Sequence, residues 1–228
     1  MLKAIRALPV AILALTLPGV AAAQSVSVGV LGGINLVNYT GPSVGGGWRP
    51  SPWGGGTVML AVNPKLEIRA EVAFAHLGSH TLTLDQEPGV VGGAPVIVET
   101  RNSVSPSHVV VPVLVSAVFP VSPDGRVSVR LGGGPSVGYR ARCSAATRVR
   151  TINESGATLS SSTTEDTCGD TIRTIDVGLA ANAGVRSQLA WGDLFADARY
   201  RIGLVSAVAG SGGRFQQMSV SVGVAFGL

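Results

Sequence analysis

The chain has 228 residues, with 17 Lys and Arg, 13 Asp and Glu, and a formal net charge of +4. Charged residues make up only 13% of it, about half the share of an ordinary soluble domain, and the arginines are scattered instead of forming a stripe. This composition argues against nucleic-acid binding and indicates that something other than water covers much of the surface.

The first residues have the three parts of a secretory signal peptide. Met1 to Arg6 is basic, Ala7 to Val20 is apolar, and Ala21-Ala22-Ala23 forms a small-residue cleavage site. A transmembrane anchor is the weaker interpretation, because two prolines interrupt the apolar run and a spanning helix needs roughly 20 residues. We expect a signal peptide over residues 1–23 and one outer-membrane barrel domain over residues 24–228.

The remaining sequence predicts eight β-strands. From Met218 to Leu228, Met, Val and Phe alternate with Ser, Gly and Ala at a period of two, and the same alternation recurs in most of the other segments. A second face of small residues is typical of the inside of a narrow barrel whose apolar face meets lipid. The expected strands are 25–37, 53–62, 65–79, 107–119, 127–140, 172–187, 193–205 and 218–228.

One of these segments, Ser107 to Phe119, alternates poorly. It is apolar on both faces, and Pro112 inside it removes a ladder hydrogen bond. The longest apolar run outside the signal peptide, Val109 to Val121, contains two prolines and is too short for a membrane-spanning helix. A helical membrane protein is therefore excluded.

The connections between the strands alternate in length. Asn63 to Lys65, Val121 to Gly125 and Gln188 to Gly192 are short. Long connections are expected at 38–52, 78–106, 142–170 and 207–213. Outer-membrane barrels have short periplasmic turns and long extracellular loops, so both termini are expected in the periplasm. The fold class is thus all-β, an eight-stranded antiparallel up-and-down transmembrane β-barrel.

Charges of both signs fall on the faces that are expected to point inward. They are Glu67, Arg69, Glu71, Arg130, Asp176, Arg186, Asp197, Arg199 and Arg201. A barrel of eight strands is just wide enough for side chains to fill, which favours a structural plug of paired charges. A narrow gated conductance, or a binding site at the mouth, is the functional alternative.

Cys143 and Cys168 flank the longest expected loop in a chain that is routed to an oxidising compartment. A disulfide is the favoured interpretation and would contribute on the order of 3 kcal/mol. Free thiols or a metal site are the alternatives, although two cysteines without a nearby histidine make a poor zinc site.

Few residues suggest chemistry. His76 and His80 would be roughly 13 Å apart on a strand, too far to share a metal, and are interpreted as polar residues at the outer rim. Ser107 and His108 are an adjacent Ser–His pair, but neighbours on a strand point to opposite faces. We expect no enzyme activity, no metal and no cofactor.

Four segments resemble the PorT-like outer-membrane β-barrel family. They are Val28-Gly29-Val30-Leu31-Gly32-Gly33-Ile34-Asn35, Asn63-Pro64-Lys65-Leu66-Glu67-Ile68-Arg69-Ala70-Glu71, Val111-Pro112-Val113-Leu114 and Leu131-Gly132-Gly133-Gly134-Pro135-Ser136-Val137-Gly138-Tyr139. The resemblance implies an eight-stranded outer-membrane barrel, often described as porin-like, and transfers no catalytic residue. The last strand departs from the common pattern, because Leu228 stands where an aromatic is usual and Phe226 lies two residues earlier.

These observations favour a structural or interaction barrel whose surface loops meet an unidentified extracellular partner. A porin-like passive channel for ions or small solutes is the alternative, and a soluble lipocalin-like barrel is a third hypothesis that would require a polar outer face. The expected partners are outer-membrane lipid and, during insertion, the barrel-assembly machinery. A monomer is expected.

Overall fold

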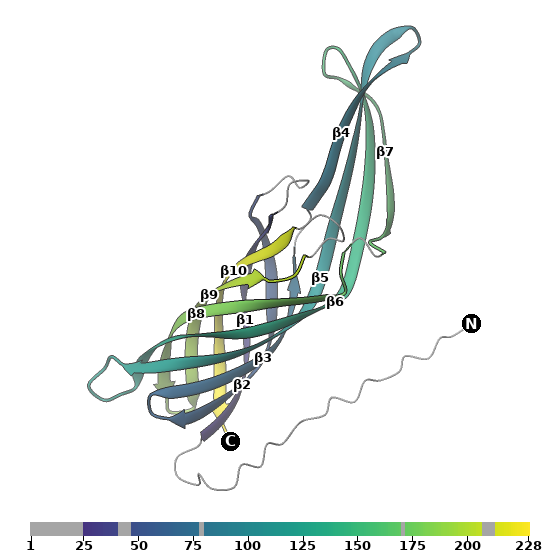
Figure 1. Cartoon of the computed structure of the whole chain (residues 1–228). Helices are drawn as coiled ribbons and strands as arrows, with labels where there is room; N and C mark the ends of the chain where they lie inside the picture. Colours follow the sequence, from purple (N-terminus) through teal and green to yellow (C-terminus); the bar gives the residue numbers. More distant parts are fainter. Residues whose placement is uncertain (1–24, 41–46, 78–79, 170–171, 207–212) are drawn as a thin grey trace.

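The strands are antiparallel throughout. The computed structural model describes residues 25–40, 47–77, 80–169, 172–206 and 213–228, and the expected signal peptide lies outside them. The described residues form ten strands (Figure 1). Their bounds are β1 (Ser25–Thr40), β2 (Arg49–Asn63), β3 (Leu66–His76), β4 (His80–Val91), β5 (Ala94–Pro120), β6 (Val127–Asn153), β7 (Thr158–Thr167), β8 (Ile175–Leu189), β9 (Gly192–Gly203) and β10 (Arg214–Gly227). Among them, no helix is long and apolar enough to cross a membrane.

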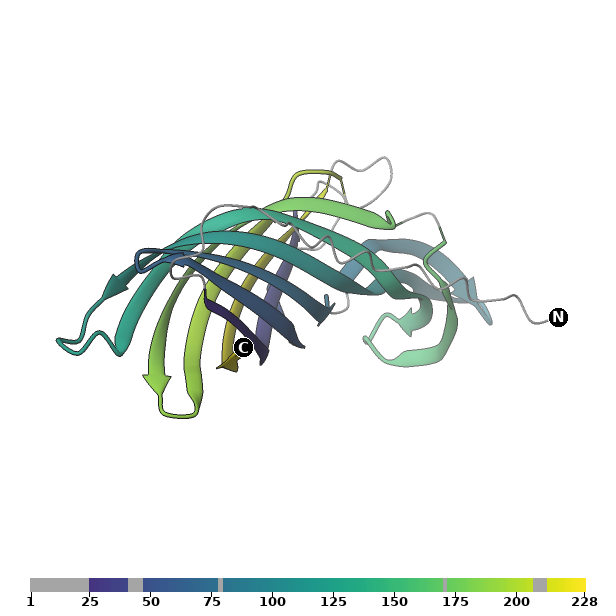
Figure 2. The same ribbon diagram turned by 90° about the horizontal axis from the view of Figure 1, so that it is seen from below.

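Eight of the strands close into a barrel. β1 pairs with β2 on one side and β10 on the other, and the ring continues through β9, β8, β6, β5 and β3 back to β2. Pairing of β5 with β6 closes it, and Figure 2 shows the strands curving around a common interior. The prediction of an eight-stranded antiparallel up-and-down barrel is confirmed. Pro112 is accommodated within β5, where it faces the interior opposite Ser136 of β6.

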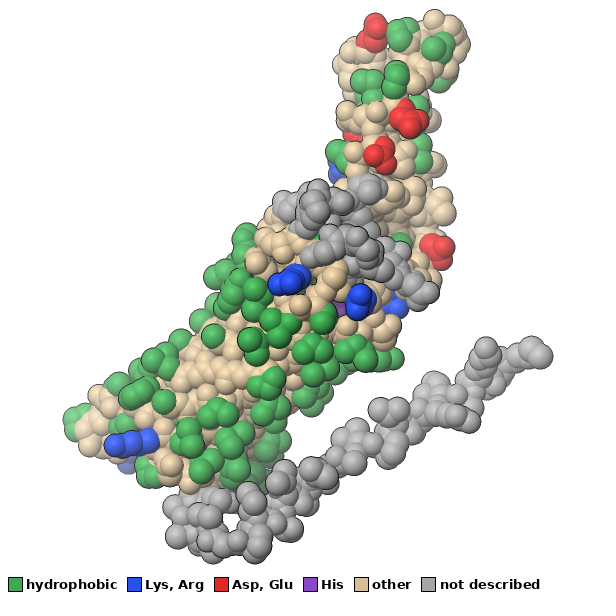
Figure 3. All heavy atoms as spheres, viewed as in Figure 1, with side chains coloured by type: hydrophobic (Ala, Val, Ile, Leu, Met, Phe, Trp, Pro, Cys, Tyr) green, Lys and Arg blue, Asp and Glu red, His purple; other side chains and the backbone are tan. Residues whose placement is uncertain are grey.

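The outward face of the barrel is apolar. Val30 and Ile34 of β1 and Val220 and Val222 of β10 are each more than 60% exposed, and green apolar atoms cover much of the barrel in Figure 3. Outward valines alternate with inward serines because a strand turns successive side chains to opposite faces. Burying such a surface in water-free lipid is favourable, whereas in water it would be an aggregation hazard.

Aromatic side chains mark both ends of this apolar surface. Phe74 of β3 and Tyr139 of β6 lie in one cross-strand row with Val109 of β5 between them, and both aromatics are more than half exposed. At the other end, near the chain termini, the rings of Trp191 and Phe226 are 6.1 Å apart. Exposed aromatics at both edges of an apolar band are typical of membrane interfaces.

Two of the expected loops are in fact folded, which corrects the prediction for residues 78–106 and 142–170. β5 and β6 have 27 residues each and stay paired along almost their whole length. At about 3.3 Å per residue this is roughly 90 Å, whereas crossing a bilayer takes about 9 to 11 tilted residues. β4 pairs with the first half of β5 and β7 with the second half of β6. The result is a four-stranded sheet that continues beyond the barrel, named here the extension (Figure 1).

The extension is a single layer. Every side chain of β7 is exposed, and both β4 and β7 are edge strands. Gly92 and Gly93, with φ of +60° and +84°, form the tight turn between β4 and β5. Because the side chains of β7 and most of the described side chains of β4 are exposed, these strands have no need of the apolar alternation that identifies the barrel strands.

Candidate functional site

The barrel interior holds a network of charged side chains. All nine residues expected to point inward do so, and most of them are almost fully buried, with Arg130 at 0% exposure. They come from β3, β6, β8 and β9. The strand β10, which pairs with β9, presents the small residues Ser219, Ser221 and Gly223 to the interior. The long charged side chains thus occupy the space that these small residues leave, as a narrow barrel requires.

Asp197 lies at the centre of the network. Its Oδ2 accepts a hydrogen bond from Arg69 Nη1 at 2.6 Å and another from Arg130 Nη2 at 3.2 Å. Arg130 also donates through Nη1 to Glu67 Oε1 at 3.0 Å. Two guanidinium groups therefore share one carboxylate, and each of them has a second acidic partner: Arg69 Nε lies 3.2 Å from Glu71 Oε1.

The network continues in both directions from this centre. Arg199 donates two parallel hydrogen bonds of 2.7 Å to the Glu71 carboxylate, the bidentate geometry that gives the strongest Arg–carboxylate pairs. At the other end, Arg186 Nη1 donates to Glu67 Oε2 at 2.9 Å and lies 3.9 Å from Asp193. One chain of ion pairs thus links strands on opposite walls of the barrel.

A separate pair lies nearer the extension. Arg201 Nη2 donates to Asp176 Oδ2 at 2.7 Å, and Arg201 Nε donates to the Ser136 hydroxyl. Together with the longer chain, this places five arginines and five carboxylates in the interior. Burying charges is costly unless each is paired, and the equal numbers satisfy that condition.

Aromatic rings pack against the guanidinium groups. The Arg130 guanidinium lies 5.2 Å from the ring centroid of Phe195 and that of Arg69 lies 5.9 Å from it, both within cation–π distance. The Arg199 guanidinium lies 5.4 Å from the ring of Trp53. Gly223 of β10 makes room for Phe195, because a Cβ atom there would lie 2.3 Å from its Cζ.

The interior has a different character at each end. Near the chain termini a cavity of about 420 Å³ opens, lined by residues that include Ser27, Met59, Glu67, Arg186 and Asp193. Toward the extension the interior also contains a cluster of apolar side chains, and the rings of Tyr39 and Phe215 meet there at 5.4 Å. The other buried members of this apolar cluster include Leu31, Val37, Trp53, Leu77, Val104, Val110, Cys168 and Ile172. Side chains therefore fill the middle and the far end of the barrel.

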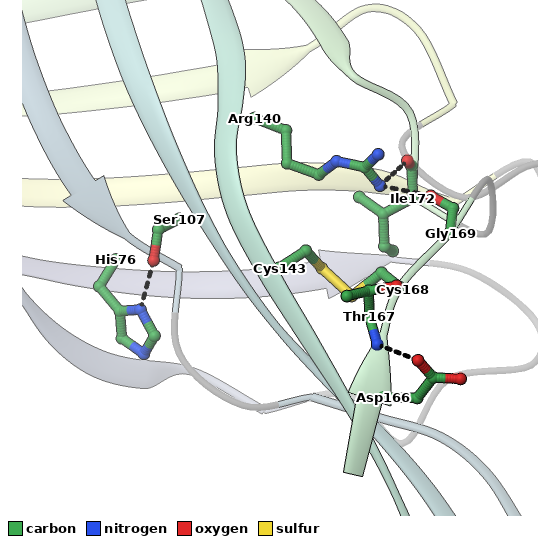
Figure 4. The surroundings of a disulfide bond; sticks show 9 residues. All are labelled: His76, Ser107, Arg140, Cys143, Asp166, Thr167, Cys168, Gly169 and Ile172. Carbon is green, nitrogen blue, oxygen red and sulfur yellow. Dashed lines mark hydrogen bonds between the residues drawn. A yellow bond between two sulfur atoms is a disulfide. The ribbon is translucent and has the colours of Figure 1, made fainter. Parts of the chain in front are cut away.

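The predicted disulfide is present at the base of the extension. Cys143 and Cys168 are bonded, with their Cα atoms 5.5 Å apart, directly after the last β6–β7 pair, Ser144 with Thr167. Figure 4 shows the neighbouring Arg140, whose Nη1 donates to the carbonyl oxygens of Gly169 and Ile172. The disulfide and Arg140 thus fasten the end of the β6–β7 hairpin to the barrel rim.

Sequence reasoning missed three features. Asp193 and Phe195 join the interior, and their even spacing from Asp197 on β9 is the signal that identifies them. The third is a contact between His76 Nδ1 and the Ser107 hydroxyl at 2.9 Å across β3 and β5 (Figure 4). Within the described part of the chain no carboxylate contacts His76, so a third member of a catalytic triad is missing there.

Three solved outer-membrane proteins are similar to this chain. Neisserial surface protein A (NspA) is 15% identical with a TM-score of 0.37, and the match covers 90% of this chain and 99% of NspA. Ail of Yersinia pestis, in complex with the heparin analogue sucrose octasulfate, is 11% identical with a TM-score of 0.35, covering 90% and 100%. OprG of Pseudomonas aeruginosa is 10% identical with a TM-score of 0.41, covering 89% and 97%.

No curated protein matches the sequence. A family model does match it, over residues 22–208, which is most of the chain. Its description, an outer membrane protein beta-barrel domain, agrees with the closed ring of eight strands and with the apolar outward face described above. The chain therefore belongs to the outer membrane protein beta-barrel domain family.

Proposed function

We propose that this protein is a structural or interaction barrel of the outer membrane that presents the extension to a partner outside the cell and performs no chemistry. The observation that carries the proposal is the combination of a filled interior with a folded sheet beyond it. A protein selected for passage of solutes has no need of a sheet that stands far above the membrane.

Two features of the ends of the barrel support a proposed orientation. The C-terminus and the start of β1 lie together at the end opposite the extension (Figure 1). The turns at that end are short, as periplasmic turns are. We therefore place both termini in the periplasm and the extension outside the cell. The proposal also includes export by a signal peptide over residues 1–23, a mature domain over residues 24–228 and insertion by the barrel-assembly machinery. Within the family, we propose that the chain belongs to the PorT-like subfamily.

The extension is suited to contact with another molecule. Edge strands carry backbone N–H and C=O groups without a neighbouring strand, and such edges accept an added strand from a partner. β7 is rich in Ser and Thr, and Glu165 and Asp166 near its end keep it charged. Charged edge residues oppose pairing between copies of the same chain, which supports a monomer.

A porin-like narrow channel is the second candidate, and one observation favours it. The cavity near the termini reaches Glu67 and Arg186, so ions have access to the lower end of the charged network. Beyond that point Arg130 and Asp197 are nearly inaccessible to solvent. Conduction would require these ion pairs to open, at a cost of several kcal/mol.

Planar-bilayer recording of the purified protein tests the proposal. We expect no discrete conductance steps from the natural sequence. The variant Arg130→Ala with Asp197→Ala, which removes one charge of each sign from the centre, should conduct if the network is the barrier. Stable open steps from the natural sequence would refute the filled-interior proposal and establish the channel.

A short epitope inserted between Gly92 and Gly93 tests the orientation independently. Antibody binding to intact cells is expected, and binding only after the outer membrane is permeabilised would reverse the proposed topology. The matched control is the same epitope after Asp124, in the turn between β5 and β6 at the opposite end, where antibody should bind only after permeabilisation.

A further inference from the structure

One polar row lies just above the aromatic row at the outer edge of the barrel. His76 of β3 pairs with Ser107 of β5, and Ser107 pairs in turn with Arg142 of β6. The aromatic row beneath it is Phe74 and Tyr139 with Val109 between them. Cross-strand partners share a face of the sheet, so this row of His, Ser and Arg follows the outward row of aromatics on the same three strands.

A β-bulge creates this arrangement. The register of β5 and β6 shifts between Ser107 and His108, so Tyr139 and Arg142 share a face although three residues separate them. Without the shift, strict alternation would turn Arg142 to the opposite face from Tyr139. Bulges often redirect a side chain near a functional site.

The row offers hydrogen-bond donors and one permanent positive charge. Arg142 is exposed, and within the described part of the chain no carboxylate forms an ion pair with it. His76 Nδ1 and the Ser107 hydroxyl share one hydrogen bond. Whichever of the two donates, either the O–H of Ser107, which is 5% exposed, or the Nε2–H of the more exposed His76 is left to donate to a ligand. The three side chains together therefore suit an anion with several oxygens.

The surroundings decide which anion. In the view of Figure 3 the Asp and Glu side chains lie over the extension, whereas most of the Lys and Arg side chains lie at its junction with the barrel and at the barrel's other end. Below the row, Val72, Val111 and Val137 continue the exposed apolar surface. A ligand that fits both parts has a phosphate at the level of Arg142 and hydrocarbon below Phe74 and Tyr139. Arg recognises phosphate with parallel hydrogen bonds, and aromatics lie at the level of lipid headgroups.

We propose that His76, Ser107 and Arg142 bind the phosphate of an outer-leaflet lipid whose acyl chains lie along the outward face of β3, β5 and β6. The inference rests on the membrane placement proposed above, though not on the partner of the extension. It makes the bulge at Ser107 a recognition feature and places a lipid directly beneath the base of the extension.

Native mass spectrometry of the full mature protein in detergent tests the site with three probes. They are phosphatidic acid, diacylglycerol with the same acyl chains, and inorganic phosphate. We expect phosphatidic acid to be retained in preference to the other two. Arg142→Ala should weaken its binding about tenfold, the typical effect of losing a hydrogen bond from a charged group, and Arg142→Lys should weaken it less.

Arg148→Ala is the matched control, because Arg148 is an exposed arginine further along the same strand, within the extension. It should bind phosphatidic acid as the natural sequence does. Equal retention of diacylglycerol would show an acyl groove without phosphate recognition, and equal binding of inorganic phosphate would show a free-anion site; either result overturns the proposal. Unchanged binding by Arg142→Ala also overturns it, provided that heat-modifiable gel mobility shows the variant to be folded.

The epitope experiment separates the two proposals. If the epitope at Gly92 is exposed on cells but Arg142→Ala binds lipid as before, the lipid site is ruled out and the proposed function is unaffected. An epitope that is not exposed, together with a tenfold loss of binding, leaves a phosphate site in a protein of reversed orientation.

Discussion

Replacing Asp197 by Asn tests whether the interior network stabilises the barrel. The side chain is 2% exposed and accepts hydrogen bonds from both Arg69 and Arg130. Asn has almost the same size, so the substitution leaves no cavity, but it removes the charge and replaces one acceptor oxygen with an NH2 donor. Arg69 and Arg130 then lose the carboxylate that they share, in a site that water cannot reach.

The expected cost is large for a single isosteric change. Removing one partner of a buried ion pair costs about 3 to 5 kcal/mol, because the other charge stays buried without compensation. With a urea slope of about 1 to 3 kcal/mol per molar, the unfolding midpoint should fall by at least about 1 M. Urea unfolding of the mature protein in lipid vesicles, followed by the heat-modifiable shift in gel mobility, measures this change.

A double variant shows whether charge balance is the cause. Arg69→Gln with Asp197→Asn removes one charge of each sign, and its cost should be smaller than the sum of the two single costs by about 1 kcal/mol or more. Asp124→Asn is the control. Asp124 lies in the exposed β5–β6 turn, where a hydrogen bond from the Ser122 side chain, followed by one from the Arg126 backbone N–H, lowers its pKa. Because this turn is exposed to water, its substitution should lower the midpoint much less than Asp197→Asn does.

Two results would contradict a stabilising network: a midpoint for Asp197→Asn within error of the natural sequence, or a double variant that costs as much as the two single variants together. Either result would mean that water or rearranged side chains compensate the arginines, and the interior would then be open enough to reconsider a channel.

Three further predictions concern other parts of the molecule. Cys143→Ser removes the disulfide and should lower the free energy of unfolding by about 3 kcal/mol. If the barrel remains folded, protease should cleave the extension while the barrel stays resistant. Gly223→Val should destabilise the barrel by about 1 to 3 kcal/mol through collision with Phe195, and Phe195→Leu in the same chain should recover part of the loss in urea unfolding. Val220→Arg on the lipid face should cost about 2 to 4 kcal/mol in vesicles, and a cost near zero would contradict the membrane placement of β10.

The sequence alone was sufficient to predict which side chains of the barrel strands face outward and which face inward. In β10, the alternation of Met218, Val220 and Val222 with serines correctly predicts which residues face outward. The same reasoning on β3 and β9 places Glu67 and Asp197 inside. It succeeds because the two faces of a barrel strand meet different surroundings, lipid and packed side chains, and a strand has a period of two.

Only the tertiary structure decided how these residues meet. Arg69 and Asp197 are 128 positions apart, and their contact depends on the closure of the whole ring and on the register of each strand pair. The extension was predicted as loops, because strands such as β7, whose side chains are exposed on both faces, lack an apolar alternation. The row of His76, Ser107 and Arg142 depends on a one-residue bulge. A strict period of two would place Arg142 on the opposite face of the strand.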